Sequence, residues 1–224
     1  MTGRPILFSA AMIRAILREI EAPGTGKTQT RRVMNPQPKG ISSANRVHSS
    51  CWDITPESNC CSVDFQAPKF AAGDRLWVRE TWAARMIHGW TIADARSRMC
   101  QEEILYKADE HNSIDGWWPS IHMPREFSRL TLHVTDVRVQ RLQDISEADA
   151  RAEGIERLKS GRGYYDHTVS KGAVRAGIWH HKATDAFEVL WDGLNAKRAP
   201  WASNPWVVAV TFRPELGNID RVAA

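Results

Sequence analysis

Residues 130–139 read LTLHVTDVRV, and residues 145–155, a few positions downstream, read ISEADARAEGI. In the first segment apolar and polar residues alternate, as in a strand that buries one face. The second segment opens with Ser146, a favoured N-cap residue, and has Asp149 at the third helical position, as in a capping box. Gly154 is suited to end the helix. The two segments therefore predict a strand followed by a short helix.

Further short elements are predicted on both sides of this pair from apolar runs, helical spacing and turn residues. In the stretch RLWVRE, which follows the turn signal Gly73-Asp74, Leu76 and Val78 are expected on one face and Trp77 and Arg79 on the other. The other predicted elements are a strand at 5–8, a helix at 10–20 capped by Ser9, a strand at 104–107, a helix at 183–194 and a closing strand at 206–212.

Short strands separated by turns, with two or three helices at the edges, predict an α+β fold built on a small β-barrel rather than repeating βαβ units. A length of 224 residues fits one domain over 1–224, with long insertions near 40–70, 84–125 and 156–180. We expect the first insertion to be irregular apart from one short pairing near Val63–Phe65. The third is Gly-rich and basic and is expected to be a mobile loop.

The composition, 42% hydrophobic and 25% charged, is that of a soluble globular protein. No apolar stretch reaches the ~18 residues of a membrane span, and the N-terminus lacks the apolar region of a signal peptide. We therefore expect a cytoplasmic protein with no membrane partner. His48, Cys51, Cys60 and Cys61 match no common zinc-binding spacing, so free thiols and no metal or other cofactor are predicted.

Basic residues cluster in one part of the sequence. Between Gly24 and His48 there are five basic residues and no acidic one, although the net charge of the chain is only +4. Such a segment is either a phosphate-facing patch or a solvated basic loop. The chain also has ten tryptophans, of which an exposed one could stack on a nucleic-acid base.

Residues 22–32, APGTGKTQTRR, contain a string that looks like the end of a phosphate-binding P-loop. A P-loop requires a glycine at position 21, where this chain has Glu21. A P-loop also follows a strand and opens a helix, whereas here a predicted helix comes first. The sequence therefore excludes a P-loop, and Gly24 and Gly26 are interpreted as the end of that helix.

Four segments in order, GKTQTRR, GDRLWVRE, LTLHVTDVRVQRLQDISEADARAEGI and NPWVVAVTFRP, resemble the ASCH domain. With PILFSAAMIRAIL near the start and WDGLN near the end, the chain is similar to the version common in phages and prophages. The resemblance covers most of the chain apart from the three insertions. It implies a PUA-like β-barrel and a link to RNA and modified nucleotides.

One enzymatic branch of this family is the bacterial N4-acetylcytidine amidohydrolase. The resemblance to it implies a catalytic lysine, a threonine three residues later and a glutamate at the end of the short helix, which correspond to Lys27, Thr30 and Glu153. Arg32 matches the basic residue that closes the family's K-T-x-T-x-R motif. The large insertions of this chain depart from that branch and bear on the identity of the substrate.

Amide hydrolysis needs a nucleophile, a group that accepts its proton and a donor for the leaving amine. Thr30 offers a hydroxyl, Lys27 a base if burial lowers its pKa, and Glu153 a proton shuttle. The residues assigned to substrate binding are Arg31, Arg32, Thr28 and Trp77. In a flat strand, however, positions 27 and 30 point to opposite faces, so the segment must bend to bring these two side chains together.

Three functions remain open from the sequence. The first is an amidohydrolase acting on an acylated or otherwise modified cytosine, and the second is a non-catalytic module that binds RNA or modified nucleic acid. A metal-independent ribonuclease is a weaker third. A closed, nucleoside-sized pocket lined by Lys27, Thr30 and Glu153 would favour the enzyme, whereas an open basic groove with exposed aromatic residues would favour the binding module.

Overall fold

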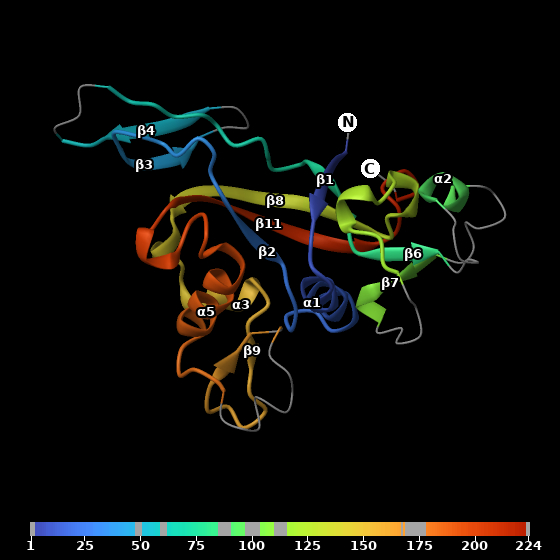
Figure 1. Cartoon of the computed structure of the whole chain (residues 1–224). Helices are drawn as coiled ribbons and strands as arrows, with labels where there is room; N and C mark the ends of the chain where they lie inside the picture. Colours follow the sequence, from blue (N-terminus) through green and yellow to red (C-terminus); the bar gives the residue numbers. More distant parts are fainter. Residues whose placement is uncertain are drawn as a thin grey trace.

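The computed structural model describes residues 3–47, 51–58, 62–84, 91–96, 104–109, 116–166, 168 and 178–222. Its centre is a five-stranded sheet in the order β1-β5-β8-β11-β2 (Figure 1). β1 and β5 are parallel, and all the other neighbouring pairs in this sheet are antiparallel. The strands are β1 (Arg4–Leu7), β2 (Gln29–Val33), β5 (Arg75–Arg79), β8 (Leu130–Arg141) and β11 (Trp206–Leu216).

β8 and β11 form the backbone of the sheet. They pair along their whole lengths, from Trp206 opposite Arg141 to Leu216 opposite Leu130, with one irregularity between Thr211 and Phe212. The predicted strand at 130–139 is confirmed and runs two residues further. The first half of β11 is buried on both faces, because helices and other strands cover it, and this explains its nearly continuous apolar sequence.

The sheet does not close into the predicted barrel. β1 and β2 are its two edges and do not pair with each other. The chain leaves β1 after Leu7 and enters a helix at Ala10, so no backbone remains there to continue a ladder towards β2. Instead a side chain bridges the gap, since the Arg32 Nη2 atom of β2 donates a hydrogen bond to the Leu7 carbonyl oxygen of β1 at 2.6 Å. The fold is therefore a mixed α/β fold on an open sheet.

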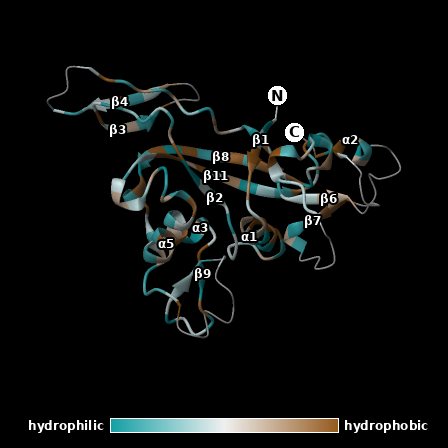
Figure 2. Cartoon of the chain, viewed as in Figure 1, coloured by the Kyte–Doolittle hydropathy of each residue, from teal (hydrophilic) through white to brown (hydrophobic). Residues whose placement is uncertain are grey.

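Helix α1 (Ala10–Glu21) packs on this sheet and contributes to its core. As predicted, Ser9 caps it, and the Ser9 hydroxyl accepts a hydrogen bond from the Met12 N–H. The side chains of Ile13 and Ile16 are completely buried against strands β1, β5, β8 and β11. Figure 2 shows hydrophobic residues along β8 and β11 and on α1, where these elements meet.

Helices α3 (Glu147–Ala152) and α5 (Ala183–Asn195) form a second core with Leu142 and Ile145, which follow β8, and with Val207 of β11. Ser146 caps α3 by accepting a hydrogen bond from the Asp149 N–H, as predicted. Glu153 is the last residue before Gly154, which takes a φ of 100° that favours glycine. Both predicted helices are thus present, with ends close to the expected residues. In the described part of the chain, no helix is long and apolar enough to cross a membrane.

Small two-stranded sheets lie in the first and third predicted insertions, and a third one joins the strand just before the second insertion to a strand inside it. The strands are β3 (Ile41–Arg46) with β4 (Trp52–Pro56), β6 (Trp82–Ala84) with β7 (Ile104–Tyr106), and β9 (Glu156–Arg157) with β10 (Tyr164–Tyr165). A short helix, α2 (Ile92–Ala95), lies near β6 and β7. The prediction that the first insertion is irregular is therefore wrong in part, because β3 and β4 form a hairpin that projects from the main sheet (Figure 1).

Other details of the insertions match the predictions more closely. A short pairing near Val63–Phe65 is present, since Asp64 forms an isolated bridge with Lys39. The third insertion was expected to be a loop, but it contains the paired strands β9 and β10. Its residues 167 and 169–177 lie outside the described residues. Short 3-10 helices complete the described elements at Lys107–Asp109, Ser120–His122, Arg125–Phe127, Leu142–Asp144 and Trp201–Ser203.

Candidate active site

Lys27 lies in the short connection between α1 and β2, which is held from two sides. The Lys27 N–H donates to the Ala15 carbonyl of α1 at 2.9 Å, and the Thr28 N–H donates to the Ala152 carbonyl of α3 at 2.8 Å. Gly26 touches α1 so closely that a β-carbon there would lie 2.3 Å from the Ala15 carbonyl oxygen. The connection is therefore fixed before β2 begins, and it directs the Lys27 side chain into the interior.

The glycine loop that looked like a P-loop already binds an anion, which is a carboxylate of the chain itself. Glu19 accepts hydrogen bonds from the Gly24 N–H at 2.9 Å and from the Gly26 N–H at 2.8 Å. Backbone N–H groups in such turns form anion-binding concavities. Glu19 occupies this one, which gives a structural reason why the loop does not hold a nucleotide phosphate.

The Lys27 side chain is completely buried and contacts Glu153 through two atoms. Its Nζ donates to the Glu153 carboxylate Oε2 at 2.6 Å and to the Glu153 carbonyl oxygen at 2.8 Å. The carbonyl groups at the end of a helix lack partners within the helix, so Lys27 both caps α3 and pairs with its last side chain. Burial lowers the pKa of Lys27, although the Glu153 carboxylate opposes that shift.

Arg31 holds Glu153 from a second direction and extends the ionic contacts towards the surface. Its Nη1 atom donates to Glu153 Oε1 at 3.1 Å, and its Nη2 atom donates to Asp149 Oδ2 at 3.1 Å. Arg138 of β8 contacts Asp149 as well, at 2.8 Å, and the Gln29 amide donates to it at 3.2 Å. Glu153 and Asp149 therefore act as acceptors for Gln29 and Arg31 of β2, and also for Lys27 and Arg138.

The charges around Asp149 change its acidity. Burial alone would raise the pKa of Asp149, but the hydrogen bond from Arg138 and the charges of Arg31 and Arg138 lower it below its ordinary value. The sequence prediction did not include Asp149, Gln29 or Arg138 in the site. Two signals were available: Asp149 and Glu153 lie four residues apart on one helix face, and Gln29 and Arg31 lie two residues apart on one strand face.

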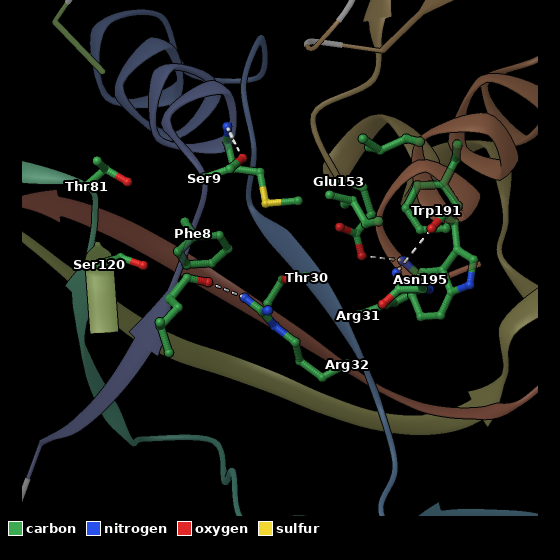
Figure 3. A pocket seen from close by; sticks show the side chains of 15 residues that line it. Phe8, Ser9, Thr30, Arg31, Arg32, Thr81, Ser120, Glu153, Trp191 and Asn195 are labelled. Carbon is green, nitrogen blue, oxygen red and sulfur yellow. Dashed lines mark hydrogen bonds and ion pairs between the residues drawn. The ribbon is translucent and has the colours of Figure 1, made fainter. Parts of the chain in front are cut away.

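A cleft of about 400 Å³ opens beside Glu153, in the gap between the two edge strands (Figure 3). Thr30, Arg31 and Arg32 from β2 line it together with Glu153. Apolar side chains form a large part of the remaining walls, from the end of β1, the start of α1 and one face of α5: Leu7, Phe8, Met12, Phe187, Leu190, Trp191 and Leu194. The cleft thus combines apolar walls with convergent polar groups, including Ser9, Thr81, Ser120 and Asn195, and this combination is typical of ligand sites.

The predicted site residues fall into four groups, of which Trp77 forms the last. Thr30, Arg31, Arg32 and Glu153 line the cleft, while Lys27 lies behind Glu153 and does not line it. Lys27 forms no hydrogen bond with Thr30, so it is Glu153 that Lys27 meets. Thr28 lines a separate groove of about 560 Å³, on the side of α3 and Arg18.

Trp77 belongs to neither of these openings. It is buried on β5, and the Arg79 guanidinium lies 4.6 Å from the centre of its indole ring. The predicted alternation in this strand is confirmed, since Leu76 and Val78 belong to the sheet core on the other face. The structure therefore does not bring Trp77 together with the residues around Glu153.

The described residues contain no group of three or more potential ligand side chains that could hold a metal ion. Cys51 is an exposed free thiol, and His48, Cys60 and Cys61, named with it in the sequence, lie outside the described residues. Comparison with known proteins found no matching family model, no matching curated protein and no matching solved structure.

Proposed function

We propose that this chain is an amidohydrolase that removes an acyl group from the exocyclic nitrogen of a modified cytosine base or nucleoside. The observation that carries the proposal is the position of Glu153. Its carboxylate lines a cleft, and two cations, Lys27 and Arg31, contact it from the protein side. The resemblance of the sequence to the ASCH domain and its N4-acetylcytidine amidohydrolase branch, with a PUA-like fold, is part of the same proposal.

In the proposed reaction the Thr30 hydroxyl attacks the acyl carbonyl carbon. Its proton passes to Glu153, the bond between the acyl carbon and N4 breaks, and Glu153 returns the proton to the leaving amine. Water then adds to the Thr30 ester, which releases a carboxylic acid and regenerates the hydroxyl. Thr30 and Glu153 suit these roles because both line the same cleft.

Lys27 acts in this scheme through Glu153. Its Nζ lies 2.6 Å from Glu153 Oε2, and its pKa is lowered by burial, so it can share a proton with the carboxylate more readily than an exposed lysine can. This changes the role that we assigned from the sequence, in which Lys27 was the base for Thr30. The group that exchanges a proton with the substrate is now Glu153, and Lys27 is its positioning partner.

The size and lining of the cleft suit a partly apolar substrate. Phe187 and Trp191 present apolar surfaces from α5, and a volume of about 400 Å³ lies within the range of small-molecule sites. The alternative of a nucleic-acid binding module relies on exposed aromatic residues for stacking. No tryptophan in the described part of the chain is exposed, so we favour the enzyme.

A panel of N4-acylated cytidines tests the proposal, with cytidine release followed by chromatography. We expect Glu153→Gln to reduce turnover by roughly 10²–10⁴-fold, the usual contribution of a general acid–base group. Glu188→Gln, on an exposed position of α5, is the matched control and should keep full activity. Circular dichroism must show that both variants are folded. Wild-type turnover of Glu153→Gln, or no cytidine release by the wild-type chain, would contradict the proposal.

Thr30 is tested separately, because water could replace its hydroxyl as the nucleophile. We expect Thr30→Ala to lose most activity and Thr30→Ser to keep a substantial part of it, since serine retains the hydroxyl. A wild-type rate in Thr30→Ala would show that water attacks directly. Mass spectrometry of the intact protein during turnover provides a second readout, because a Thr30 nucleophile gives a transient acyl adduct that is lost in Thr30→Ala, whereas direct attack by water gives none.

A further inference from the structure

Arg31 and Arg32 are neighbours in β2, but their contacts differ. The side chain of Arg31 is fully buried and paired with the carboxylates of Glu153 and Asp149. Arg32 donates to the Leu7 carbonyl at 2.6 Å, and its guanidinium lies 5.2 Å from the centre of the Phe8 ring. Within the described residues no carboxylate forms an ion pair with Arg32. Arg32 is therefore a cation that is held in place but whose charge is not neutralised.

The surroundings of Arg32 make an unpaired charge costly. Burial lowers the pKa of Arg32, and only the charge of Glu153 opposes this effect. Arg32 is half-buried, and charges with reduced hydration in proteins are normally paired, because the loss of hydration is otherwise not compensated. An anion beside Arg32 would supply the missing partner, and none of the described side chains provides it.

Arg32 also occupies a special position, since it lines two cavities. One is the cleft next to Glu153, and the other is a cavity of about 170 Å³ further along β2. The polar residues of the second cavity are Arg32, Asn35, Gln66 and Lys69, and its described lining contains no acidic side chain. On the cleft side, Ser9 marks the N-terminus of the 12-residue helix α1, whose partial positive charge favours anions.

We propose that Arg32 binds a phosphate group of the substrate, so that the chain acts on a nucleotide rather than on a free nucleoside. This inference rests on the proposed function, because it places the base in the cleft beside Glu153. A planar guanidinium binds phosphate through two parallel hydrogen bonds. Arg32 uses only one of its nitrogen atoms to donate to the Leu7 carbonyl, so its other nitrogen atoms can donate to a phosphate. The phosphate belongs either to a nucleoside monophosphate or to a polynucleotide. In the second case the strand continues into the cavity that contains Lys69.

Binding of the deacylated products tests the inference without requiring turnover. The probes are cytidine, cytidine 3′-monophosphate, cytidine 5′-monophosphate and a cytidine trinucleotide, titrated by calorimetry at low salt. We expect at least one phosphorylated probe to bind the wild-type chain about tenfold more tightly than cytidine, as one charge-assisted contact provides. This advantage should shrink as salt is raised, because Arg32 is half-buried and salt screens charge interactions that solvent can reach.

Variants at Arg32 test whether this residue causes the tighter binding of the phosphorylated probes. In Arg32→Gln the phosphorylated probes should bind no better than cytidine, and Arg32→Lys should retain part of the advantage because it keeps the charge. Arg213→Gln, on an exposed position outside both cavities, is the matched control and should retain all of it. Circular dichroism and thermal melting establish that each variant is folded. Equal affinities of all probes for the wild-type chain, or an unchanged advantage in Arg32→Gln, would overturn the inference.

The same experiment separates the two sources of phosphate. A trinucleotide that binds more tightly than both monophosphates, and loses this gain in Lys69→Ala, identifies a polynucleotide. If the monophosphates bind at least as tightly as the trinucleotide, the phosphate belongs to a free nucleotide.

Failure of the inference also differs from failure of the proposed function. Deacylation without any preference for phosphate overturns only the inference, whereas an Arg32-dependent phosphate advantage without deacylation of any substrate overturns only the enzyme.

Discussion

Glu153 accepts hydrogen bonds from two buried cations that come from the other end of the sequence. The partners Lys27 and Arg31 lie in and beside β2, and they reach Glu153 from two directions at 2.6 and 3.1 Å. Removing one member of such a buried set leaves the others uncompensated, which is why each of these side chains matters for stability as well as for chemistry. At the level of single residues, the site is one carboxylate at the end of a helix, held by cations from a neighbouring strand.

Asp149 provides a test at this level because it positions Arg31 without lining the cleft. We expect Asp149→Asn to lower the free energy of unfolding by about 1–3 kcal/mol at neutral pH, since three donors lose a charged acceptor. Turnover should fall mainly through kcat, because Arg31 then holds Glu153 less firmly. Asp136→Asn is the control: Asp136 is more than half exposed and pairs with Arg138 at the surface, so little change is expected.

The effect of Asp149 should also depend on pH with a defined sign. Its pKa is lowered in the folded chain from an ordinary value of 3.8, so its contribution is present above that value and is lost as the pH falls through the lowered pKa. The free energies of unfolding of the wild-type chain and of Asp149→Asn, measured with urea, should therefore become equal as the pH is lowered. A difference in unfolding free energy that stays constant down to the acid limit would contradict this account.

The connection between α1 and β2 shows how one element positions the site. The helix ends at Glu21, Glu19 binds the N–H groups of the glycine loop, and Gly26 packs against the backbone of the helix that precedes it. Because the loop is fixed at both α1 and α3, Lys27 enters the interior before β2 begins. The glycines therefore determine where the lysine goes, and they do so by close packing rather than by binding phosphate.

Gly26→Ala tests this packing. Its β-carbon would lie 2.3 Å from the Ala15 carbonyl oxygen and 2.4 Å from the Glu19 nitrogen, which are backbone atoms that can move only if the loop leaves the helix. We expect a loss of at least about 1–3 kcal/mol in unfolding free energy, the usual cost of overpacking, together with reduced activity. Chemical denaturation and turnover assays measure the two effects.

Gly193→Ala is the matched control for this substitution. Gly193 lies inside α5 and is exposed, and a β-carbon added there would meet no atom within 4 Å, so alanine should leave the structure unchanged. The higher helix propensity of alanine should instead stabilise the chain by up to about 1 kcal/mol. A Gly26→Ala variant as stable as Gly193→Ala would show that the loop is not held as described.

The open sheet creates the cleft at the level of the whole molecule. β1 and β2 remain apart, α1 begins at the end of β1, and α5 covers the other side with an apolar face, as Figures 1 and 3 show. A closed ladder between the two edge strands would remove the gap in which the cleft lies. The departure from the predicted barrel is thus the feature that gives Glu153 and Thr30 a common opening.

The buried lysine should affect the stability of the whole molecule in alkaline solution. The pKa of Lys27 is lowered in the folded chain from an ordinary value of 10.5, so between the lowered pKa and 10.5 the unfolded chain binds more protons. The free energy of unfolding should therefore rise with pH in that window. Urea unfolding below about pH 10 measures the slope, and Lys27→Met should flatten it.

The pH range in which Lys27 makes stability rise ends where the ionisation of buried tyrosines begins to lower stability. Burial raises the pKa of Tyr106 from 10.0 to about 12, so the unfolded chain loses this proton first and stability falls as the pH rises beyond 10.0. Measurements are therefore confined to lower pH. An identical slope in the wild-type chain and in Lys27→Met would show that Lys27 keeps its ordinary pKa.

Most of the local elements could be predicted from the sequence. The alternation in residues 130–139, the cap at Ser146 and the helical spacing of residues 10–20 and 183–194 predicted elements that the structure contains, because these signals depend on neighbours within a few residues. The hairpin of β3 and β4 was missed, since its strands carry few apolar residues and these do not alternate regularly with polar ones.

The assembly of the site, in contrast, became clear only in three dimensions. The spacing of Lys27 and Thr30 left open whether the two side chains converge, and the structure pairs Lys27 with Glu153, 126 residues away. The same holds for Asp149, Gln29 and Arg138, and for the gap that Arg32 bridges between β1 and β2. These contacts follow from where the loop, α3 and the sheet edges meet in space, and local sequence patterns carry no information about contacts between such distant segments.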